Sequence, residues 1–398
     1  AFFHKDELKL LWPFYAESIL STLLFIYPPF WVLYFQSINL SLFQIGVLML
    51  PISVASFLFE IPTGAIADIF GRKFSTLLGY FLCGIFVVSI FFFKDFWSLF
   101  VIFTLWGIAG TFISGAEEAW VADNLKFRGR PELLKEYYIK RHSFIRFSLL
   151  VAGFVGAFLV KSFGLGIIWP ITGFSLISSG IILSFVGEKR VKLTCPHNLR
   201  MIYDQSKKSI RFGIMHRVLF FLFAIVLIEG LCGTLSGEFM WQPFLKNLGF
   251  PVYAFGYLFS GLMLIGAFAP YLAKPLLKIA RTERALLTII TVFHIALFIS
   301  VLFTGKWFAA IMIMGLITLG SDIYNPLMGC YFQKFVPSRM RATTVSFNHM
   351  LYSIGFALSG PLVGFLGDLF GPRFAIALGG LILMPIVFLY LAIKEKND

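Results

Sequence analysis

Several carboxylic side chains lie inside long apolar stretches of the sequence, where they could exchange a proton. Glu229 lies eleven residues after Val218, where one such stretch begins, and Asp322 lies fifteen residues after Trp307, where another begins. With a rise of 1.5 Å per residue, Glu229 would lie about 16 Å into a helix, near the middle of a bilayer. Glu17 lies in the first apolar stretch. Because ionisable groups at this depth are costly, they usually pair or line a water-filled path. We therefore predict that Glu229, Asp322 and Glu17 are candidates for proton coupling, with buried structural roles as the alternative.

A second group of charges lies on two consecutive apolar stretches. Glu117 and Glu118 lie about 10 Å from the end of the fourth stretch, and Arg146 lies at a similar depth in the fifth. We predict an ion pair between Arg146 and one of the two glutamates, with Arg141 nearer the surface beside Asp123. Such a network either holds two helices together or binds an anionic or zwitterionic substrate.

Uncharged polar residues add further candidates. Asn325 precedes Pro326, and because proline lacks a backbone N–H, we predict a helix break here that frees carbonyl groups. Tyr34 and Tyr324 are candidates for contact with an amphipathic substrate.

We expect no cofactor. The four cysteines have no paired spacing, so we expect neither disulfides nor a cysteine-based metal site.

The composition predicts the elements that position these residues. Apolar residues make up 59% of the chain and charged residues 13%, against about a quarter charged in ordinary soluble domains. We predict an all-α integral membrane protein with twelve transmembrane helices near Leu10–Phe35, Gln44–Ala67, Ser75–Phe93, Trp97–Asn124, Tyr137–Val160, Gly166–Val186, Val218–Leu245, Tyr253–Ile279, Ala285–Phe303, Trp307–Phe335, Thr343–Leu366 and Phe374–Ile393.

The basic residues are distributed unevenly between the connections. Lys and Arg gather in every second connection, and the others carry about one each. This alternation predicts a multi-pass protein of the cell (inner or plasma) membrane with both termini in the cytoplasm. It also argues against the interpretation that the net charge of +13 serves to bind nucleic acid.

The spans divide six and six around the longest connection. We predict an N-terminal bundle over residues 1–186, a cytoplasmic linker over 187–217 and a C-terminal bundle over 218–398. Trp31 and Gly46 align with Trp241 and Gly256 at an offset of 210, which indicates two pseudo-symmetric halves. In the linker, Asn198–Gly213 is either an amphipathic surface helix or a solvated basic segment.

The connection between spans two and three carries a recognisable motif. The pattern Gly-x-x-x-Asp-x-x-Gly-Arg-Lys, formed by Gly64, Asp68, Gly71, Arg72 and Lys73, resembles the signature loop of the major facilitator superfamily. In this loop we expect Gly64 to allow close helix contact, Gly71 to turn the chain and Asp68 to pair with basic groups. We assign these five residues and Asp123 to gating. Glu60, which leads into the loop, is given a structural role.

Other segments resemble the drug and siderophore exporter branches of this superfamily. They are Pro337–Thr343 before span eleven, Ser114–Asp123 in span four and the signature-like Gly364–Arg373 before span twelve. The loop after span eight departs from the signature, with Lys278 in place of its Asp. Span four also lacks the Arg linked with proton coupling, and span five lacks the antiport motif, so the direction of transport stays open.

The resemblance implies a major facilitator fold in which spans one, four, seven and ten line the cavity. It implies a monomeric secondary active transporter that moves a small amphipathic organic molecule by alternating access, coupled to protons, with export favoured. The alternatives are uptake of a nutrient or siderophore by the same fold, and a lipid flippase or scramblase. The sequence contains no His-Glu-x-x-His, Gly-x-Ser-x-Gly or P-loop motif, which argues against an enzyme or an ATP-driven pump.

Overall fold

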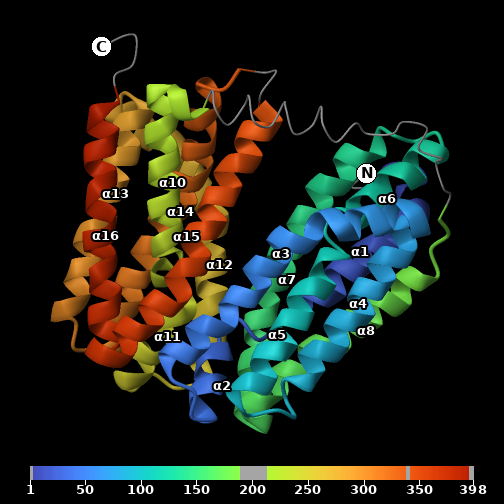
Figure 1. Ribbon diagram of the computed structural model, residues 1–398, viewed down its shortest axis with the longest axis horizontal. Coiled ribbons are helices and arrows are strands. Elements are labelled where there is room, and N and C mark those ends of the chain that lie inside the picture. Colours follow the sequence, from blue (N-terminus) through green and yellow to red (C-terminus); the bar gives the residue numbers. More distant parts are fainter. Residues whose placement is uncertain (1–2, 189–212, 338–340, 394–398) are drawn as a thin grey trace. The chain divides into compact units, whose positions relative to one another are not determined.

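The computed structural model of the protein describes residues 3–188, 213–337 and 341–393, and within these ranges every regular element is a helix (Figure 1). The predicted surface helix Asn198–Gly213 lies outside the described residues except for Gly213. The first half contains α1 (Glu7–Leu23), α2 (Trp31–Ser37), α3 (Leu42–Phe70), α4 (Arg72–Ser89), α5 (Phe96–Thr111), α6 (Ala116–Phe127), α7 (Leu133–Phe163), the short 3₁₀ helix η1 (Leu165–Ile167) and α8 (Ile168–Ser184). The second half contains α10 (Arg217–Ser236), α11 (Glu238–Asn247), α12 (Ala254–Ala280), α13 (Glu283–Ser300), η2 (Val301–Phe303), α14 (Trp307–Lys334), α15 (Arg341–Phe370) and α16 (Pro372–Ala392).

The described helices confirm the membrane class. Among the described residues, eleven helical segments are long and apolar enough to cross a membrane, and two of them join consecutive α-helices, α5 with α6 and α10 with α11. The first predicted span, Leu10–Phe35, differs because it is divided into α1, of 17 residues, and α2, of 7 residues. Neither helix alone reaches the roughly 20 residues that a bilayer requires.

Local sequence explains where three spans are interrupted. Between α1 and α2 lie Pro28 and Pro29, which cannot donate backbone hydrogen bonds. Between α5 and α6, Gly115 takes a φ of 70°, and between α10 and α11 the chain bends at Gly237. The break predicted in span ten at Asn325 is wrong, because α14 runs without interruption through Pro326. A long helix packed among others tolerates the one N–H that a proline removes.

The chain folds into two compact units. Unit 1 contains the residues up to Leu40 together with Val47–Leu193 and Pro251–Met263, and unit 2 contains Ser41–Gly46, Thr194–Phe250 and Leu264 onwards. Two short segments, Ser41–Gly46 and Pro251–Met263, therefore belong to the unit opposite to the one that the predicted bundle boundaries imply.

Hydrogen bonds within each unit hold these two segments. In unit 2 the Asp368 carboxylate accepts from the backbone N–H groups of Leu42, at 2.9 Å, and Phe43, at 2.8 Å. A carboxylate suits this place because the first N–H groups of α3 have no partner within the helix. In unit 1 the Ser260 hydroxyl donates to the Leu150 carbonyl at 2.6 Å.

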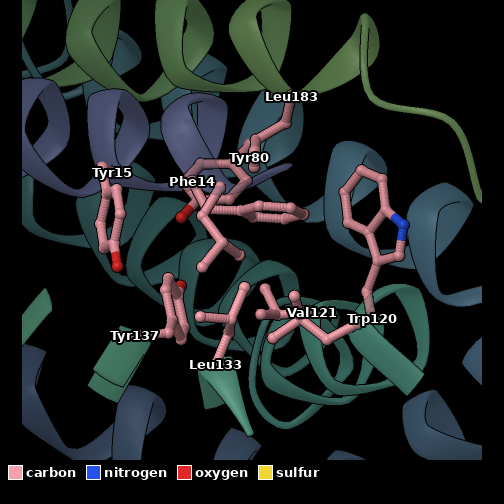
Figure 2. Packing of buried hydrophobic residues seen from close by; sticks show 10 residues of the cluster. Phe14, Tyr15, Tyr80, Trp120, Val121, Leu133, Tyr137 and Leu183 are labelled. Carbon is pink, nitrogen blue, oxygen red and sulfur yellow. The ribbon is translucent and has the colours of Figure 1, made fainter. Parts of the chain in front are cut away.

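An aromatic cluster forms part of the core of unit 1 (Figure 2). The rings of Phe14 on α1 and Trp120 on α6 meet edge to face, with centroids 5.2 Å apart. Tyr137 on α7 packs against Phe14 from another side, and Tyr80 on α4 belongs to the same cluster. This packing fixes the orientation of the polar side chains on α1, α4, α6 and α7 that meet in the candidate site.

Helices α4 and α8 cross closely at a pair of glycines. A Cβ atom on Gly84 would stand 2.8 Å from the Gly173 carbonyl oxygen, which is closer than real Cβ contacts allow. We expect Gly84→Ala to lower the free energy of unfolding by about 1–3 kcal/mol, because the two backbones must separate. Thermal unfolding of purified protein in detergent measures this. Gly261→Ala is the control, since nothing lies within 4 Å of that added methyl group; equal melting temperatures for the two variants would contradict the prediction.

Candidate functional site

Four residues from four helices of unit 1 form a group that we call the N-terminal carboxyl cluster, in which three are buried and the arginine is partly exposed: Glu17 on α1, Tyr80 on α4, Glu117 on α6 and Arg141 on α7. The Tyr80 hydroxyl oxygen lies 2.6 Å from Oε1 of Glu17 and 2.9 Å from Oε2 of Glu117. Arg141 Nη2 donates to Oε1 of Glu117 at 3.1 Å. Glu17 and Glu117 are only 1% and 3% exposed. One phenol therefore bridges two buried carboxyl groups.

Neighbouring hydroxyls complete the hydrogen bonding of Glu17. The Ser18 hydroxyl oxygen lies 3.0 Å from Oε2 of Glu17 and 2.8 Å from the Phe14 carbonyl oxygen, so its one hydrogen serves either of them, and Ser21 donates to Oε1 of Glu17 at 2.9 Å. Arg141 Nε donates to the Ser18 hydroxyl oxygen at 3.1 Å, which connects the two ends of the cluster. Glu17 is thus held by hydroxyl donors, whereas Glu117 has a guanidinium partner.

The geometry has a consequence for the number of protons in the cluster. A phenol carries one hydrogen, so Tyr80 can donate to only one of the two carboxyl groups that its oxygen approaches. If both carboxyl groups were ionised, lone pairs would face each other across the second contact. If the carboxyl group that receives no hydrogen bond from Tyr80 is protonated, it donates to the Tyr80 hydroxyl oxygen, and this contact becomes a hydrogen bond. With that proton the formal charges of Glu17, Glu117 and Arg141 sum to zero.

The predicted ion pair of Arg146 is wrong. Among the described residues Arg146 forms no ion pair, and Arg141 binds Glu117 instead, with Glu118 Oε1 3.8 Å from Arg141 Nη1. Arg141 and Arg146 are five residues apart, so they point about 140° away from each other around α7. Helix α7 begins at Leu133, earlier than predicted, so Arg141 lies about two turns inside the helix and not near its end.

Sequence reasoning missed Tyr80 and a nearby buried ion pair. Lys140 Nζ lies 2.7 and 2.6 Å from the two carboxylate oxygens of Glu7, and the Tyr15 hydroxyl donates to Oε1 of Glu7 at 2.8 Å. Glu7 is 0% exposed and Lys140 is 5% exposed. Both lie at the polar ends of apolar stretches, where the sequence indicates solvent. For Tyr80, the only signal was a phenol inside an apolar stretch.

A second polar group surrounds Glu229 in unit 2. The Tyr324 hydroxyl donates to Glu229 Oε1, and the hydroxyl oxygens of Tyr324 and Tyr390 lie 2.5 Å apart. These groups adjoin a cavity of about 140 Å³, which we call the Glu229 cavity; its polar lining residues include Glu229, His294, Ser321, Tyr324, Asn325 and Tyr352. The structure therefore brings together three predicted candidates, Glu229, Tyr324 and Asn325.

Two other candidates do not line the Glu229 cavity. The Asp322 carboxylate lies against α12 at Gly266. Asp322 and Tyr324 are two residues apart on α14, so their side chains point in nearly opposite directions. Tyr34 is 4% exposed in the packed core of unit 1, where its hydroxyl donates to the Ile90 carbonyl at 3.2 Å. Asp322 and Glu229 are thus separate candidates, and the position of Tyr34 is that of a packing residue.

The signature loop is a tight turn tied to two other helix ends. Gly71 takes a φ of 108° between α3 and α4, as its role in turning the chain requires. Arg72 Nη1 lies 2.6 Å from Asp123 Oδ2, so the gating candidates Arg72 and Asp123 form an ion pair. Lys73 Nζ donates to the Ser184 carbonyl at 2.6 Å.

The other expectations for this loop are not met. Asp68 is exposed and forms no ion pair in the described part of the chain. Within unit 1, none of the described residues lies within 4 Å of a Cβ added at Gly64, so the expected close helix contact is not formed there. Glu188, which the sequence did not single out, accepts instead from the backbone N–H groups of Arg72 at 2.6 Å and Lys73 at 3.1 Å.

Asp95, which lies outside the membrane-spanning segments, caps a helix. The Asp95 carboxylate accepts from the backbone N–H of Ser98 at 2.9 Å at the start of α5, and this hydrogen bond holds the pKa of Asp95 below its usual value. Among the described residues, no group of three or more His, Cys, Asp or Glu side chains is arranged to hold a metal ion.

Comparison with known proteins identifies the class of this chain. The profile of the Major Facilitator Superfamily matches residues 14–359, and the chain belongs to this superfamily. It is a multi-pass membrane transporter and not an enzyme. It is 26% identical over 403 residues to the MFS-type transporter YxaM of Bacillus subtilis (strain 168). The aligned residues cover 97% of this chain and 96% of YxaM.

Solved structures show the same fold. A point-mutant form of the nucleoside transporter NupG matches with a TM-score of 0.80 and 14% identity, over 97% of this chain and 100% of NupG. The second structure is a bacterial homologue of the human lysosomal transporter Spinster in an inward-facing and unoccupied conformation. It matches with a TM-score of 0.72 and 17% identity, over 98% of this chain and 95% of the homologue. A D-xylose–proton symporter matches with a TM-score of 0.69 and 12% identity, over 98% and 99%.

Proposed function

We propose that this transporter is proton-coupled and exports a small amphipathic organic molecule across the cell membrane by alternating access, with both termini in the cytoplasm. The observation that carries the proposal is the single phenol of Tyr80 between the carboxyl groups of Glu17 and Glu117. A buried pair that needs one proton to satisfy its hydrogen bonds is a suitable device for binding and releasing a proton.

The proton changes the charge of the cluster. With both carboxyl groups ionised, Glu17, Glu117 and Arg141 carry a formal charge of −1, and with one proton they carry none. Glu118 lies at the edge of the cluster with its side chain 55% exposed, so it is not one of the buried charges. Because burial disfavours net charge, release of the proton favours a conformation that admits water to the cluster. A proton gradient then biases the equilibrium between two states.

Other features support parts of the proposal. One structural neighbour is described as a proton symporter, and Glu229, hydrogen-bonded by Tyr324, is a second candidate for proton coupling. Asp322 remains a third candidate. The direction rests on the segments that resemble exporter branches, Ser114–Asp123 and Pro337–Thr343.

Proteoliposomes with an imposed pH gradient test the proposal. The purified protein would be offered radiolabelled uridine, D-xylose and 2-phenylethylammonium, the first two chosen from the cargo named for the structural neighbours. We expect one probe to accumulate in vesicles with an acidic lumen, where outward proton flow drives substrate inward as it would drive export from a cell. Accumulation is measured above that of protein-free vesicles, because a weak base such as phenylethylamine is trapped in an acidic lumen without any transporter, and a protonophore should abolish it. Accumulation only in vesicles with an alkaline lumen would overturn export, and transport insensitive to the gradient would overturn proton coupling.

A further inference from the structure

A cavity of about 300 Å³ lies in unit 1 beside the interruptions of spans one and four, and the proposed proton site does not include it. Tyr27 lines it from the segment between α1 and α2, and Ser114 from the segment between α5 and α6. Glu60 on α3 and Trp106 on α5 complete its polar and aromatic lining, and the other lining residues are Ile52, Gly107, Gly110 and Thr111. The cavity lies within the size range of small-molecule pockets.

Glu60 on α3 is a carboxylate without a basic partner among the described residues. It lies ten residues before the end of α3 at Phe70, at the last position of Leu42–Glu60, the segment of α3 that is long and apolar enough to cross a membrane, and it is exposed. The Ser114 hydroxyl lies 3.3 Å from its Oε1, and no Lys, Arg or His of the described residues forms an ion pair with it. Glu7 and Glu117 in the same unit each have a basic partner. The structural role that the sequence predicted for Glu60 therefore has no contact to support it beyond this one weak hydrogen bond.

Aromatic rings stand beside this carboxylate. The Tyr27 and Trp106 rings have centroids 5.9 Å apart and meet nearly at right angles. Trp169 stacks on Tyr27 at 5.2 Å, which fixes the orientation of the Tyr27 ring. A carboxylate together with aromatic faces is the set of groups that attracts a positively charged nitrogen.

The charge of the lining selects the ligand. Glu60 is the one ionisable carboxylate among the lining residues, and the lining contains no Lys or Arg. An anionic ligand would meet the uncompensated negative charge of Glu60, whereas a cation would supply its missing partner. The interrupted helices beside the cavity match the general construction of binding sites in transporters.

We propose that this cavity binds the ammonium end of a small organic cation, with Glu60 as its counter-ion and the rings of Trp106 and Tyr27 beside it. The inference rests on the proposed function only in taking the bound cation as the transported molecule. It narrows the cargo from an amphipathic molecule to an amphipathic amine.

The test measures binding to the purified full chain in detergent at neutral pH and without a gradient. Isothermal titration calorimetry would compare 2-phenylethylammonium with 2-phenylethanol, which is neutral, and phenylacetate, which is anionic. We expect the ammonium ion to bind at least about tenfold more tightly than the alcohol, because only the cation forms a charge-assisted hydrogen bond with Glu60. Phenylacetate should not bind measurably.

Three variants locate the binding at this cavity. Glu60→Gln keeps the shape but removes the charge and should weaken ammonium binding about tenfold or more. Trp106→Ala should weaken it by about 3- to 30-fold. Gly110→Leu should block it by filling the cavity, since nothing lies within 4 Å of a Cβ at that position. Glu132→Gln is the matched control, because Glu132 is an exposed carboxylate outside the cavity.

The outcomes separate this inference from the proposed function. Equal affinity for the ammonium ion and the alcohol, absence of binding by the ammonium ion, or undiminished binding by Glu60→Gln would each overturn the cation site. None of these results depends on a proton gradient. Conversely, ammonium binding that requires Glu60, together with transport that ignores the pH gradient, would establish the site and remove the proton coupling.

Discussion

Glu17→Gln is expected to abolish pH-gradient-driven accumulation while leaving exchange of substrate across the membrane within a few-fold of the original chain. For one proton per substrate, a gradient of two pH units sustains up to about 100-fold accumulation, because each unit corresponds to a factor of ten. The variant should bring this ratio close to one. Proteoliposomes preloaded with unlabelled substrate measure exchange, and empty ones with a pH gradient measure accumulation.

The reason is the charge of the N-terminal carboxyl cluster. Glutamine can donate from its amide nitrogen to the Tyr80 hydroxyl oxygen and can accept from Ser18 through its amide oxygen, and the ion pair of Glu117 with Arg141 stays in place. Tyr80 can then donate to Glu117, and the cluster is neutral while Glu117 is ionised and Arg141 is charged. The variant therefore resembles the protonated cluster permanently. Glu117→Gln is a less suitable choice, because it would leave Arg141 without its buried partner.

Two comparisons make this prediction specific. Glu132→Gln, an exposed carboxylate before α7, should leave accumulation unchanged. Glu229→Gln tests the second candidate in unit 2. If Glu17→Gln still accumulates substrate fully and Glu229→Gln does not, the coupling proton belongs to the Glu229 cavity.

Lys140→Met is expected to reduce the free energy of unfolding by about 3–5 kcal/mol, the effect of stranding a buried charge. Glu7, 0% exposed, would lose the partner that contacts both of its oxygens and would keep only the Tyr15 hydroxyl and the His4 backbone N–H as donors. Equilibrium unfolding of the detergent-solubilised protein in denaturant measures the change.

A double variant shows whether the loss comes from the unpaired charge. Glu7→Gln combined with Lys140→Met removes both charges and should recover most of the lost stability, since replacing a whole buried pair is often nearly neutral. Lys94→Met, at an exposed lysine between α4 and α5, is the control and should change stability by less than about 0.5 kcal/mol. A change of less than 1 kcal/mol in Lys140→Met would show that water reaches Glu7 in solution.

Much of the fold was predictable because membrane crossing depends on local composition. Apolar length predicted the spans, and the signature at Gly71–Lys73 predicted a turn that the structure shows with a left-handed φ at Gly71. The depth of Glu17 and Glu229 followed from helical rise alone, and both lie inside helices. These properties depend on residues within one or two turns of each other.

The partners of those residues depended on how the helices rotate and pack. Arg141 and Arg146 lie on the same helix at nearby depths, and only the orientation of α7 decides that Arg141 reaches Glu117. Proline in two contexts gave opposite results: Pro28 and Pro29 interrupt span one, whereas α14 continues through Pro326. Whether packing compensates for a missing N–H is not encoded locally.

The sequence by itself determined the class of protein, the spans and the carboxyl groups at membrane depth, because the cost of placing charge in lipid acts on each segment separately. Only the tertiary structure decided that Tyr80 joins Glu17 to Glu117, that Lys140 neutralises Glu7 and that Glu60 faces a cavity beside Trp106. These contacts join residues up to 133 positions apart. They exist because four or more helices pack in one arrangement, and no local pattern specifies which side chains that arrangement brings within hydrogen-bonding distance.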